Sequence, residues 1–213
     1  MKILFIGNSH TYFNGLPYQV REMIDSAAGR GECQAWMCTA GGRDLAWHAE
    51  EGGTRMNLAC HPWDYVVLQQ KTHPFDGYEA LSAGYAGLEP LVRSSGARAL
   101  LYSTWKRKDA PESDQAEIDA AFSRLSGERG ALLVPVGAAW RRARKTHPAI
   151  ELYADDGSHA SPAGSYLAAC VFFRALTGAS PVGLPARIAP NGAALVDLPP
   201  AEAAALQRIA LEQ

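Results

Sequence analysis

The sequence has no apolar stretch long enough to cross a membrane, which requires about 18 to 20 residues. Its apolar start, Met1 to Ile6, ends at Gly7-Asn8-Ser9 and is too short for the hydrophobic region of a secretory leader. Unless a leader has been removed upstream of this start, we expect a cytoplasmic protein with no membrane partner.

Signatures of several other protein classes are also missing. There is no His-Glu-Xaa-Xaa-His or other metal-ligand spacing, no phosphate-binding P-loop, no dinucleotide fingerprint and no Gly-Xaa-Ser-Xaa-Gly motif. The formal net charge of -2 and the pI of 6.3 give no general attraction to nucleic acid. We therefore expect no metal, no cofactor and no nucleic-acid partner. The few cysteines have no metal or redox spacing, which favours free thiols at Cys33, Cys38, Cys60 and Cys170.

What the sequence does contain is an alternation of strand-like and helix-like segments. With 213 residues and 47% apolar content it can bury one sizeable core, so we expect a single domain over residues 1–213. Short apolar runs predict strands at Lys2 to Ile6, Gln34 to Cys38, Tyr65 to Gln69, Ala99 to Ser103 and Ala131 to Val136. Helical patterns lie at Leu16 to Ala28, Glu79 to Ser94, Ser113 to Ser126, Gly137 to Lys145, Ser161 to Leu176 and Ala201 to Leu211. This order predicts a parallel five-stranded sheet with helices on both faces, in the α/β class.

A serine follows the first predicted strand, and an acid and a histidine lie near the end of the chain. Ser9 comes directly after the apolar run, and Asp156-Gly157-Ser158-His159 places a carboxylate three positions before an imidazole. Serine is a poor nucleophile until a neighbouring imidazole takes its proton, and a carboxylate can fix the tautomer of that imidazole. We therefore predict Ser9 as nucleophile, His159 as base and Asp156 as orienting acid, with Asp155 as the alternative acid.

Loops after the second and third strands could complete such a site, because the carboxyl ends of parallel strands share one edge. Gly41-Gly42 follows the second strand, and glycine lets backbone N–H groups approach a ligand oxygen. Gln69 and Gln70 end the third strand, and an amide side chain can donate to the same oxygen. Alternation along a continued strand would let only one of the two glutamines face Ser9. We predict Gln69 for this role, with Gln70 as the alternative.

The order of these features resembles the SGNH (GDSL-like) hydrolase family over nearly the whole chain. The family pattern is a strand followed by Gly-Asp-Ser, a strand followed by Gly, a strand followed by a carboxamide, and a late Asp-Xaa-Xaa-His before a helix. The resemblance implies a flavodoxin-like three-layer α/β/α sandwich with a mostly parallel five-stranded sheet. It also implies the triad of Ser9, His159 and Asp156, with oxyanion donors from Ser9 N–H, Gly42 N–H and the Gln69 amide.

Two departures from the family pattern are visible. Gly-Asn-Ser replaces Gly-Asp-Ser, so Asn8 takes the place of a charged residue beside the nucleophile. The Gly-Xaa-Asn-Asp of the third block is replaced by Leu68-Gln69-Gln70-Lys71, and the longer glutamine shifts the donor by about one carbon–carbon bond. Together with the Gly-Gly-Xaa-Xaa-Leu of the second block, these changes resemble a less studied branch of the family.

The resemblance implies an ester hydrolase that removes small acyl groups such as acetyl from a carbohydrate or similar polar alcohol. Besides the oxyanion donors, Asn8 beside the nucleophile and Trp105 just past the fourth strand are expected at the substrate. His10 is expected to shape the pocket or cap the following turn, and the remaining histidines to lie on the surface or in loops. The alternatives are a non-catalytic ligand-binding module on the same scaffold and a flavodoxin-like phosphate or nucleotide binder. The sequence predicts no oligomeric state.

Overall fold

A five-stranded parallel sheet forms the centre of the molecule, in a computed structural model that describes residues 1–213. The strand order is β2-β1-β3-β4-β5, and every neighbouring pair is parallel. The strands are β1 (Lys2–Gly7), β2 (Gln34–Thr39), β3 (Tyr65–Leu68), β4 (Arg98–Ser103) and β5 (Leu132–Pro135). All five carboxyl ends therefore lie at one edge of the sheet.

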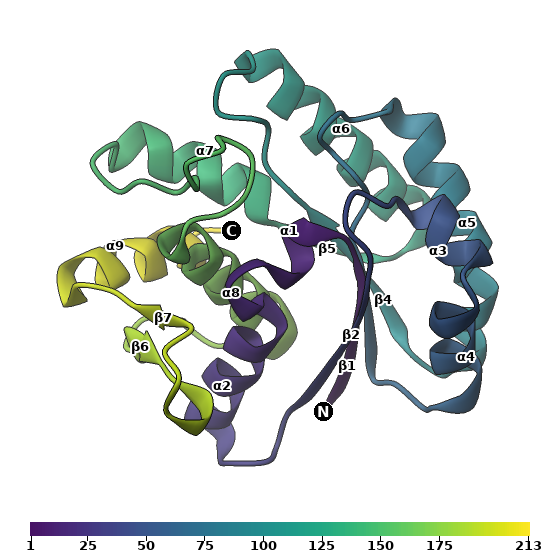
Figure 1. Cartoon of the computed structure of the whole chain (residues 1–213), viewed down its shortest axis with the longest axis horizontal. Helices are drawn as coiled ribbons and strands as arrows, with labels where there is room; N and C mark the ends of the chain where they lie inside the picture. The colour runs from purple at the N-terminus through teal and green to yellow at the C-terminus, as the bar shows by residue number, and fades with distance from the viewer.

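Helices cover both faces of this sheet, as Figure 1 shows. One face carries α2 (Leu16–Ala28), α7 (Val136–Thr146), α8 (Pro162–Thr177) and α9 (Pro200–Leu211). The other carries α3 (Leu45–Glu50), α4 (Gly52–Cys60), α5 (Gly77–Ser94) and α6 (Glu112–Arg129). Successive strand side chains alternate between the faces, so that Ile3 and Phe5 join one core and Leu4 and Ile6 the other. The predicted three-layer α/β/α class is confirmed.

The long elements lie where the sequence predicts them, and the short ones were missed. Helix α2 has the predicted bounds, and α8 begins as expected, with Ser161 Oγ accepting a hydrogen bond from the Gly164 N–H at 3.1 Å. Not predicted were the four-residue α1 (Ser9–Tyr12), the 3₁₀ turn η1 (Phe13–Gly15), and α3 and α4. Also missed were β6 (Arg187–Ile188), η2 (Pro190–Gly192) and β7 (Val196–Asp197), which lie in the segment expected to be loop-rich. Elements this short show too little periodicity to be recognised.

No helix of the protein is long and apolar enough to cross a membrane. The four cysteines are all free, as expected.

Helix α3 leads away from the loop that carries Gly42, and its position depends on a close approach to α5. A methyl group added at Gly84 of α5 would lie 2.7 Å from Leu45 Cβ and 3.0 Å from the Ala46 nitrogen. Gly127 in α6 offers a contrast, because it is exposed and a methyl group there meets nothing within 4 Å. The two helical glycines therefore differ in packing and share the same backbone context.

We predict opposite effects of alanine at these two glycines. Gly84→Ala should lower the free energy of unfolding by about 1–3 kcal/mol through overpacking. Gly127→Ala should raise it by roughly 0.5–1 kcal/mol, because alanine is the better helix former. Urea unfolding followed by circular dichroism measures both. Equal shifts in the same direction would show that the α3–α5 contact does not constrain the fold.

Candidate active site

Strand β1 delivers Ser9 to the carboxyl edge of the sheet through the buried residue Asn8. The Asn8 side chain caps helix α1 by accepting from the His10 N–H at 3.1 Å, and it donates to the Arg43 carbonyl at 2.9 Å. Only 1% of Asn8 is exposed. Because both polar atoms of the Asn8 side chain are bonded within the protein, the expected contact with the substrate needs correction. Asn8 instead ties the loop after β1 to the loop after β2.

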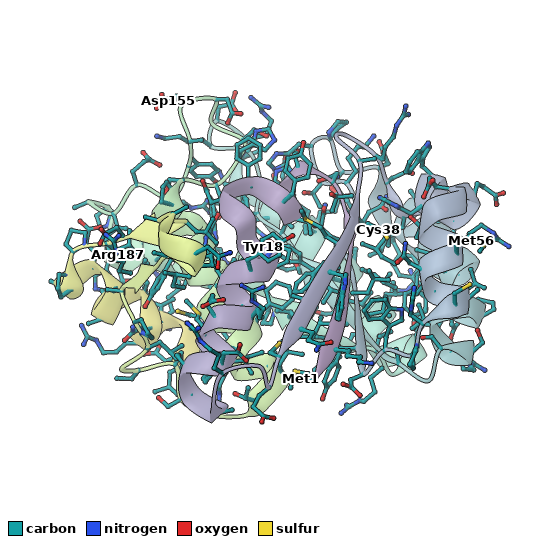
Figure 2. All side chains as sticks on the ribbon, turned by 60° about the horizontal axis from the view of Figure 1, so that its bottom comes forward. Met1, Tyr18, Cys38, Met56, Asp155 and Arg187 are labelled. Carbon is teal, nitrogen blue, oxygen red and sulfur yellow. The ribbon has the colours of Figure 1, made fainter.

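The acid and the histidine come from a self-contained loop before α8. An antiparallel bridge between Tyr153 and Ala160 closes the base of this loop. Within it, Asp156 Oδ1 accepts the backbone N–H groups of Ser158 and His159, both at 2.9 Å, which is the local turn expected of an aspartate here. The loop lies at the edge of the molecule opposite Met1, with Asp155 at its outer limit (Figure 2).

The structure brings the three predicted triad residues into one hydrogen-bonded chain. His159 Nδ1 lies 2.5 Å from Asp156 Oδ2, and His159 Nε2 lies 2.8 Å from Ser9 Oγ, across 150 positions of sequence. The carboxylate has no proton to give, so Nδ1 donates to it and the Nε2 lone pair faces the serine hydroxyl. Asp155 is exposed and makes no hydrogen bond to the imidazole.

Asp156 is held in its ionised form. Its hydrogen bond from His159, together with those from the backbone N–H groups of Ser158 and His159, keeps the pKa of the Asp156 carboxyl well below its usual range. An ionised carboxylate can fix the imidazole tautomer throughout the neutral range. About half of the Asp156 side chain remains exposed, so the chain of three residues opens to solvent at this end.

Backbone N–H groups without acceptors lie at the ends of β1 and β2. The Ser9 N–H and the Gly42 N–H donate to no atom of the protein. Gly42 has a φ of +69°, a left-handed conformation that favours glycine, and the preceding Gly41 N–H is also without an acceptor. Free donors beside a nucleophile are what a developing oxyanion requires.

The two glutamines after β3 differ in how their side-chain amides are bonded. Gln69 Oε1 accepts from the Asn8 N–H at 2.8 Å and from Thr11 Oγ1 at 3.0 Å, and Gln69 Nε2 donates to the Gln70 carbonyl at 2.6 Å. Gln70 Oε1 accepts from the Leu45 N–H at 3.0 Å, while Gln70 Nε2 has no partner in the protein. The prediction of Gln69 as oxyanion donor therefore needs correction, because its amide already supports the loop after β1. Gln70 has the free donor.

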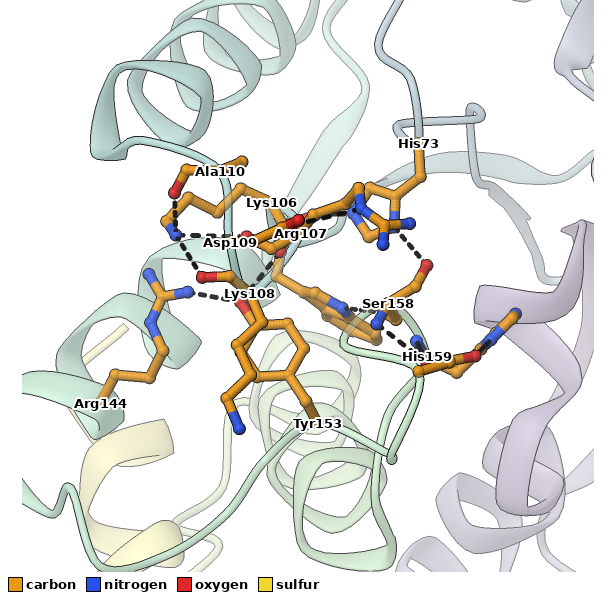
Figure 3. Close-up of polar contacts among 12 residues, drawn as sticks. His73, Lys106, Arg107, Lys108, Asp109, Ala110, Arg144, Tyr153, Ser158 and His159 are labelled. Atoms are coloured by element: carbon orange, nitrogen blue, oxygen red, sulfur yellow. Dashed lines mark hydrogen bonds and ion pairs between the residues drawn. The ribbon is translucent and has the colours of Figure 1, made fainter.

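Trp105 does not face the substrate side, and this expectation is also wrong. The ring is 1% exposed, stacks on Trp140 with centroids 3.7 Å apart, and donates from Nε1 to the Ser158 carbonyl at 2.8 Å. His73 reinforces the same contact, since its Nδ1 lies 2.7 Å from Ser158 Oγ and its Nε2 donates to the Trp105 carbonyl at 2.8 Å (Figure 3). Both residues therefore bond to Ser158 and hold the Asp156–His159 turn in place.

The loop between β4 and α6 packs on this turn as well. Its Lys108 N–H donates to the Gly157 carbonyl at 2.8 Å, and the Tyr153 hydroxyl donates to the Lys106 carbonyl at 2.9 Å. The Lys106 ammonium is almost buried and donates to the Ala110 carbonyl of the same loop at 2.5 Å (Figure 3). A buried charge is costly unless it is well bonded, so the Lys106 bonds hold this loop in one conformation.

The imidazole of His159 lies beside two aromatic rings. On one face the Phe13 ring stacks with centroids 4.0 Å apart and an interplanar angle of 10°. The His10 ring is the second neighbour, with its centroid 5.3 Å away and an interplanar angle of 24°. Burial, with the neighbouring imidazoles of His73 and His159, lowers the pKa of His10 to about 3, so this ring is neutral at neutral pH.

His73 lies in the loop between β3 and α5, as expected, whereas His48 was expected in a loop or on the surface and lies buried in a helix. His48 of α3 is 1% exposed and donates from Nε2 to the Gly7 carbonyl at 2.8 Å. His73 is the partner of Ser158 and Trp105 described above. Neither role was predictable from the sequence, because each histidine and its acceptor lie far apart in the chain. Phe13 was missed for the same reason.

The sequence matches no protein-family model and no curated protein. Solved structures are similar to it. A DUF4886 family protein from Bacteroides uniformis superposes with a TM-score of 0.79 at 21% identity, over 100% of this chain and 93% of that one. A protein from Parabacteroides merdae described as a GDSL-like lipase gives 0.66 at 18% identity, over 82% and 94%.

An acetylxylan esterase from Geobacillus stearothermophilus gives a TM-score of 0.62 at 19% identity, over 83% of this chain and 94% of that one. Identities this low establish architecture and leave the activity open. The chain has the fold of the SGNH, or GDSL-like, hydrolases.

Proposed function

We propose that this protein is a serine ester hydrolase that works through an acyl-enzyme. The observation that carries the proposal is the continuous chain from Ser9 Oγ to His159 Nε2 at 2.8 Å and from His159 Nδ1 to Asp156 Oδ2 at 2.5 Å. A nucleophile, a base and a group that orients the base are the parts that acyl transfer requires. We further propose that residues 1–213 form a single catalytic domain.

In the acylation step, Ser9 Oγ attacks the ester carbonyl carbon while His159 Nε2 takes the hydroxyl proton. The imidazolium that results is stabilised by the Asp156 carboxylate. The tetrahedral intermediate then collapses, the bond to the alcohol oxygen breaks, and His159 returns its proton to the leaving alcohol. In deacylation a water molecule takes the place of the alcohol, and the same proton transfers release the acid and restore Ser9.

The oxyanion of the intermediate would be held by donors from three strands. We assign the Ser9 N–H after β1, the Gly42 N–H after β2 and Gln70 Nε2 after β3, because none of them has an acceptor in the protein. The Gly41 N–H is equally free and is the alternative to Gly42. Gln70 is held by its carbonyl oxygen on Leu45, so its amide is fixed before the substrate arrives. Fixed donors need no reorganisation during the reaction, which is how such sites lower the barrier.

The proposed substrate is an ester of a small acyl group, such as acetyl, with a carbohydrate or similar polar alcohol. Gly41, Gly42 and Asp156 are exposed around the half-buried Ser9, so the rim is open to a bulky hydrated alcohol. The likeness to an acetylxylan esterase agrees with this class of substrate. A phosphate or nucleotide binder on the same fold would have no need for a serine, an imidazole and a carboxylate joined by hydrogen bonds, which favours the hydrolase.

We predict that a fluorophosphonate probe labels Ser9, and that Ser9→Ala abolishes both labelling and hydrolysis of p-nitrophenyl acetate. His159→Ala should lower kcat to nearly the Ser9→Ala level, because members of a triad act as a unit. Peptide mass spectrometry identifies the labelled residue, and circular dichroism checks the fold of each variant. Full activity of Ser9→Ala would contradict the proposal and leave the non-catalytic binding module as the better account.

The two neighbouring aspartates provide a matched pair for the acid. Asp156→Asn should lose on the order of 10⁴ in kcat with the fold intact, because asparagine no longer selects the imidazole tautomer. Asp155→Asn removes the same charge one residue away, from a side chain that makes no bond to the imidazole, and should retain activity. A large loss in Asp155→Asn alone would transfer the acid role to that residue.

The two glutamines should likewise differ, although both lie at the end of β3. Gln70→Ala should lower kcat by about 10² to 10³ with little change in KM, because it removes an oxyanion donor. It should also lower the free energy of unfolding, because it leaves the buried Leu45 N–H without an acceptor. Gln69→Ala should mainly lower the free energy of unfolding, because it leaves the buried Asn8 N–H without an acceptor. Steady-state kinetics and urea unfolding of both variants measure these effects. A large loss of kcat in Gln69→Ala together with unchanged kcat in Gln70→Ala would restore Gln69 as the donor.

A further inference from the structure

The catalytic imidazole is covered on one face by an aromatic ring that the proposed mechanism does not use. Phe13 stacks on His159 with centroids 4.0 Å apart and planes inclined by only 10°. The imidazole is not sealed from solvent, since 23% of the His159 side chain is exposed. A phenylalanine here therefore does more than fill a core, because it lies flat on the ring that must gain and lose a proton.

A side chain next to Phe13 holds this stack in place. Asn14 Nδ2 donates to the Ala160 carbonyl and to Ser165 Oγ, both at 2.9 Å. Asn14 follows Phe13 and Ala160 follows His159, so the bond joins the two stacked residues through their immediate neighbours. Asn14 itself has a φ of +51°, a conformation uncommon outside glycine and best tolerated by asparagine. The parallel arrangement of the rings is thus set before any substrate binds.

The charge of the imidazole changes during the reaction, and the stack responds to that change. When His159 takes the Ser9 proton it becomes a cation lying on the face of a phenyl ring, where the negative face of the ring attracts it. The neutral imidazole gains much less from the same contact. We propose that Phe13 is a positioning residue that stabilises the imidazolium form of His159 and so favours the transition state; this rests on the proposed triad.

The other groups that face His159 allow this effect to be seen. The Asp156 carboxylate is the one anion bonded to the ring, through Nδ1, and Ser9 Oγ is the neutral partner at Nε2. The centroid of His10 lies 5.3 Å from that of His159, and the centroid of His73 lies 4.5 Å from that of His10. Burial is the main cause that lowers the pKa values of both His10 and His73, so neither opposes the imidazolium with a charge near neutral pH.

The test is the pH dependence of the second-order rate at which a fluorophosphonate probe modifies Ser9, in the wild type, Phe13→Leu and Phe13→Tyr. Loss of the ring in Phe13→Leu should lower the rate at the alkaline plateau by about two- to five-fold. It should also move the acid-limb midpoint down by about 0.4 to 0.7 pH unit, because protonation of the base is then less favoured. The two profiles therefore converge at acid pH. Phe13→Tyr keeps the ring and should follow the wild type.

A merely structural role gives a different result. If Phe13 only packs, Phe13→Leu lowers the rate by one factor at every pH and leaves the midpoint in place, which overturns the inference. A Phe13→Leu profile identical to that of the wild type also overturns the inference, and so does a Phe13→Tyr profile that matches that of Phe13→Leu. Should Phe13→Leu lose the fold by circular dichroism, Phe13→Trp decides: its stronger π face should raise the midpoint, and an unmoved midpoint overturns the inference.

Failure of the proposed function is recognised separately. If Ser9→Ala still reacts with the probe, the triad assignment falls and the Phe13 inference falls with it. If modification requires Ser9 but the Phe13 variants show no shift, the hydrolase proposal stands and only the inference fails.

Discussion

Parallel strands point the same way, so their carboxyl ends must share one edge of the sheet, and the candidate site depends on this constraint. It places Ser9 beside the loop after β4, and that loop bonds to the Asp156–His159 turn, so that Ser9 Oγ lies 2.8 Å from an imidazole 150 positions later. Strand β1 is hydrogen-bonded on both sides, to β2 and β3. The loops that carry the free amide donors therefore flank the serine on either side.

Side chains that bond to backbone groups turn this shared edge into a defined geometry. The Asn8 side chain bonds the loop after β1 to the loop after β2, and Gln69, after β3, accepts from the Asn8 N–H. Asn14 bonds the segment after β1 to Ala160, the residue that follows His159. Trp105 and the Lys108 N–H, both in the loop after β4, donate to carbonyls of the Asp156–His159 turn and hold it in place. Buried polar groups are costly without partners, so each of these bonds both satisfies a group and fixes a distance. These bonds thereby place the reacting atoms.

Much of the fold could be predicted from the sequence, because long elements carry their own periodicity. Helix α2 and the five strands follow from apolar patterns, whereas α3 and α4, with six and nine residues, depend on the caps at Asp44 and Glu51 and on packing against α5. The pairing of Asp156 with His159 was predictable because both lie within one turn of chain. Their meeting with Ser9 depends in addition on the bonds between this turn and the loop after β4.

The direction of side chains beyond the strands was not predictable in the same way. Strand β3 ends at Leu68, one residue before the predicted end, so the alternation used to choose Gln69 no longer applied at that position. Trp105 follows a strand at the catalytic edge, yet the stack with Trp140 turns it inward. His73 and Phe13 take their roles from contacts with residues far along the chain, and sequence spacing carries no record of such contacts.

A crystal structure of the fluorophosphonate adduct tests the central claim most directly, because the phosphonyl oxygen stands in for the oxyanion. We expect phosphorus bonded to Ser9 Oγ, with one oxygen about 2.7–3.1 Å from the Ser9 nitrogen, the Gly42 nitrogen and Gln70 Nε2. An adduct on another residue, or an oxygen turned to solvent and away from all three donors, would contradict the account.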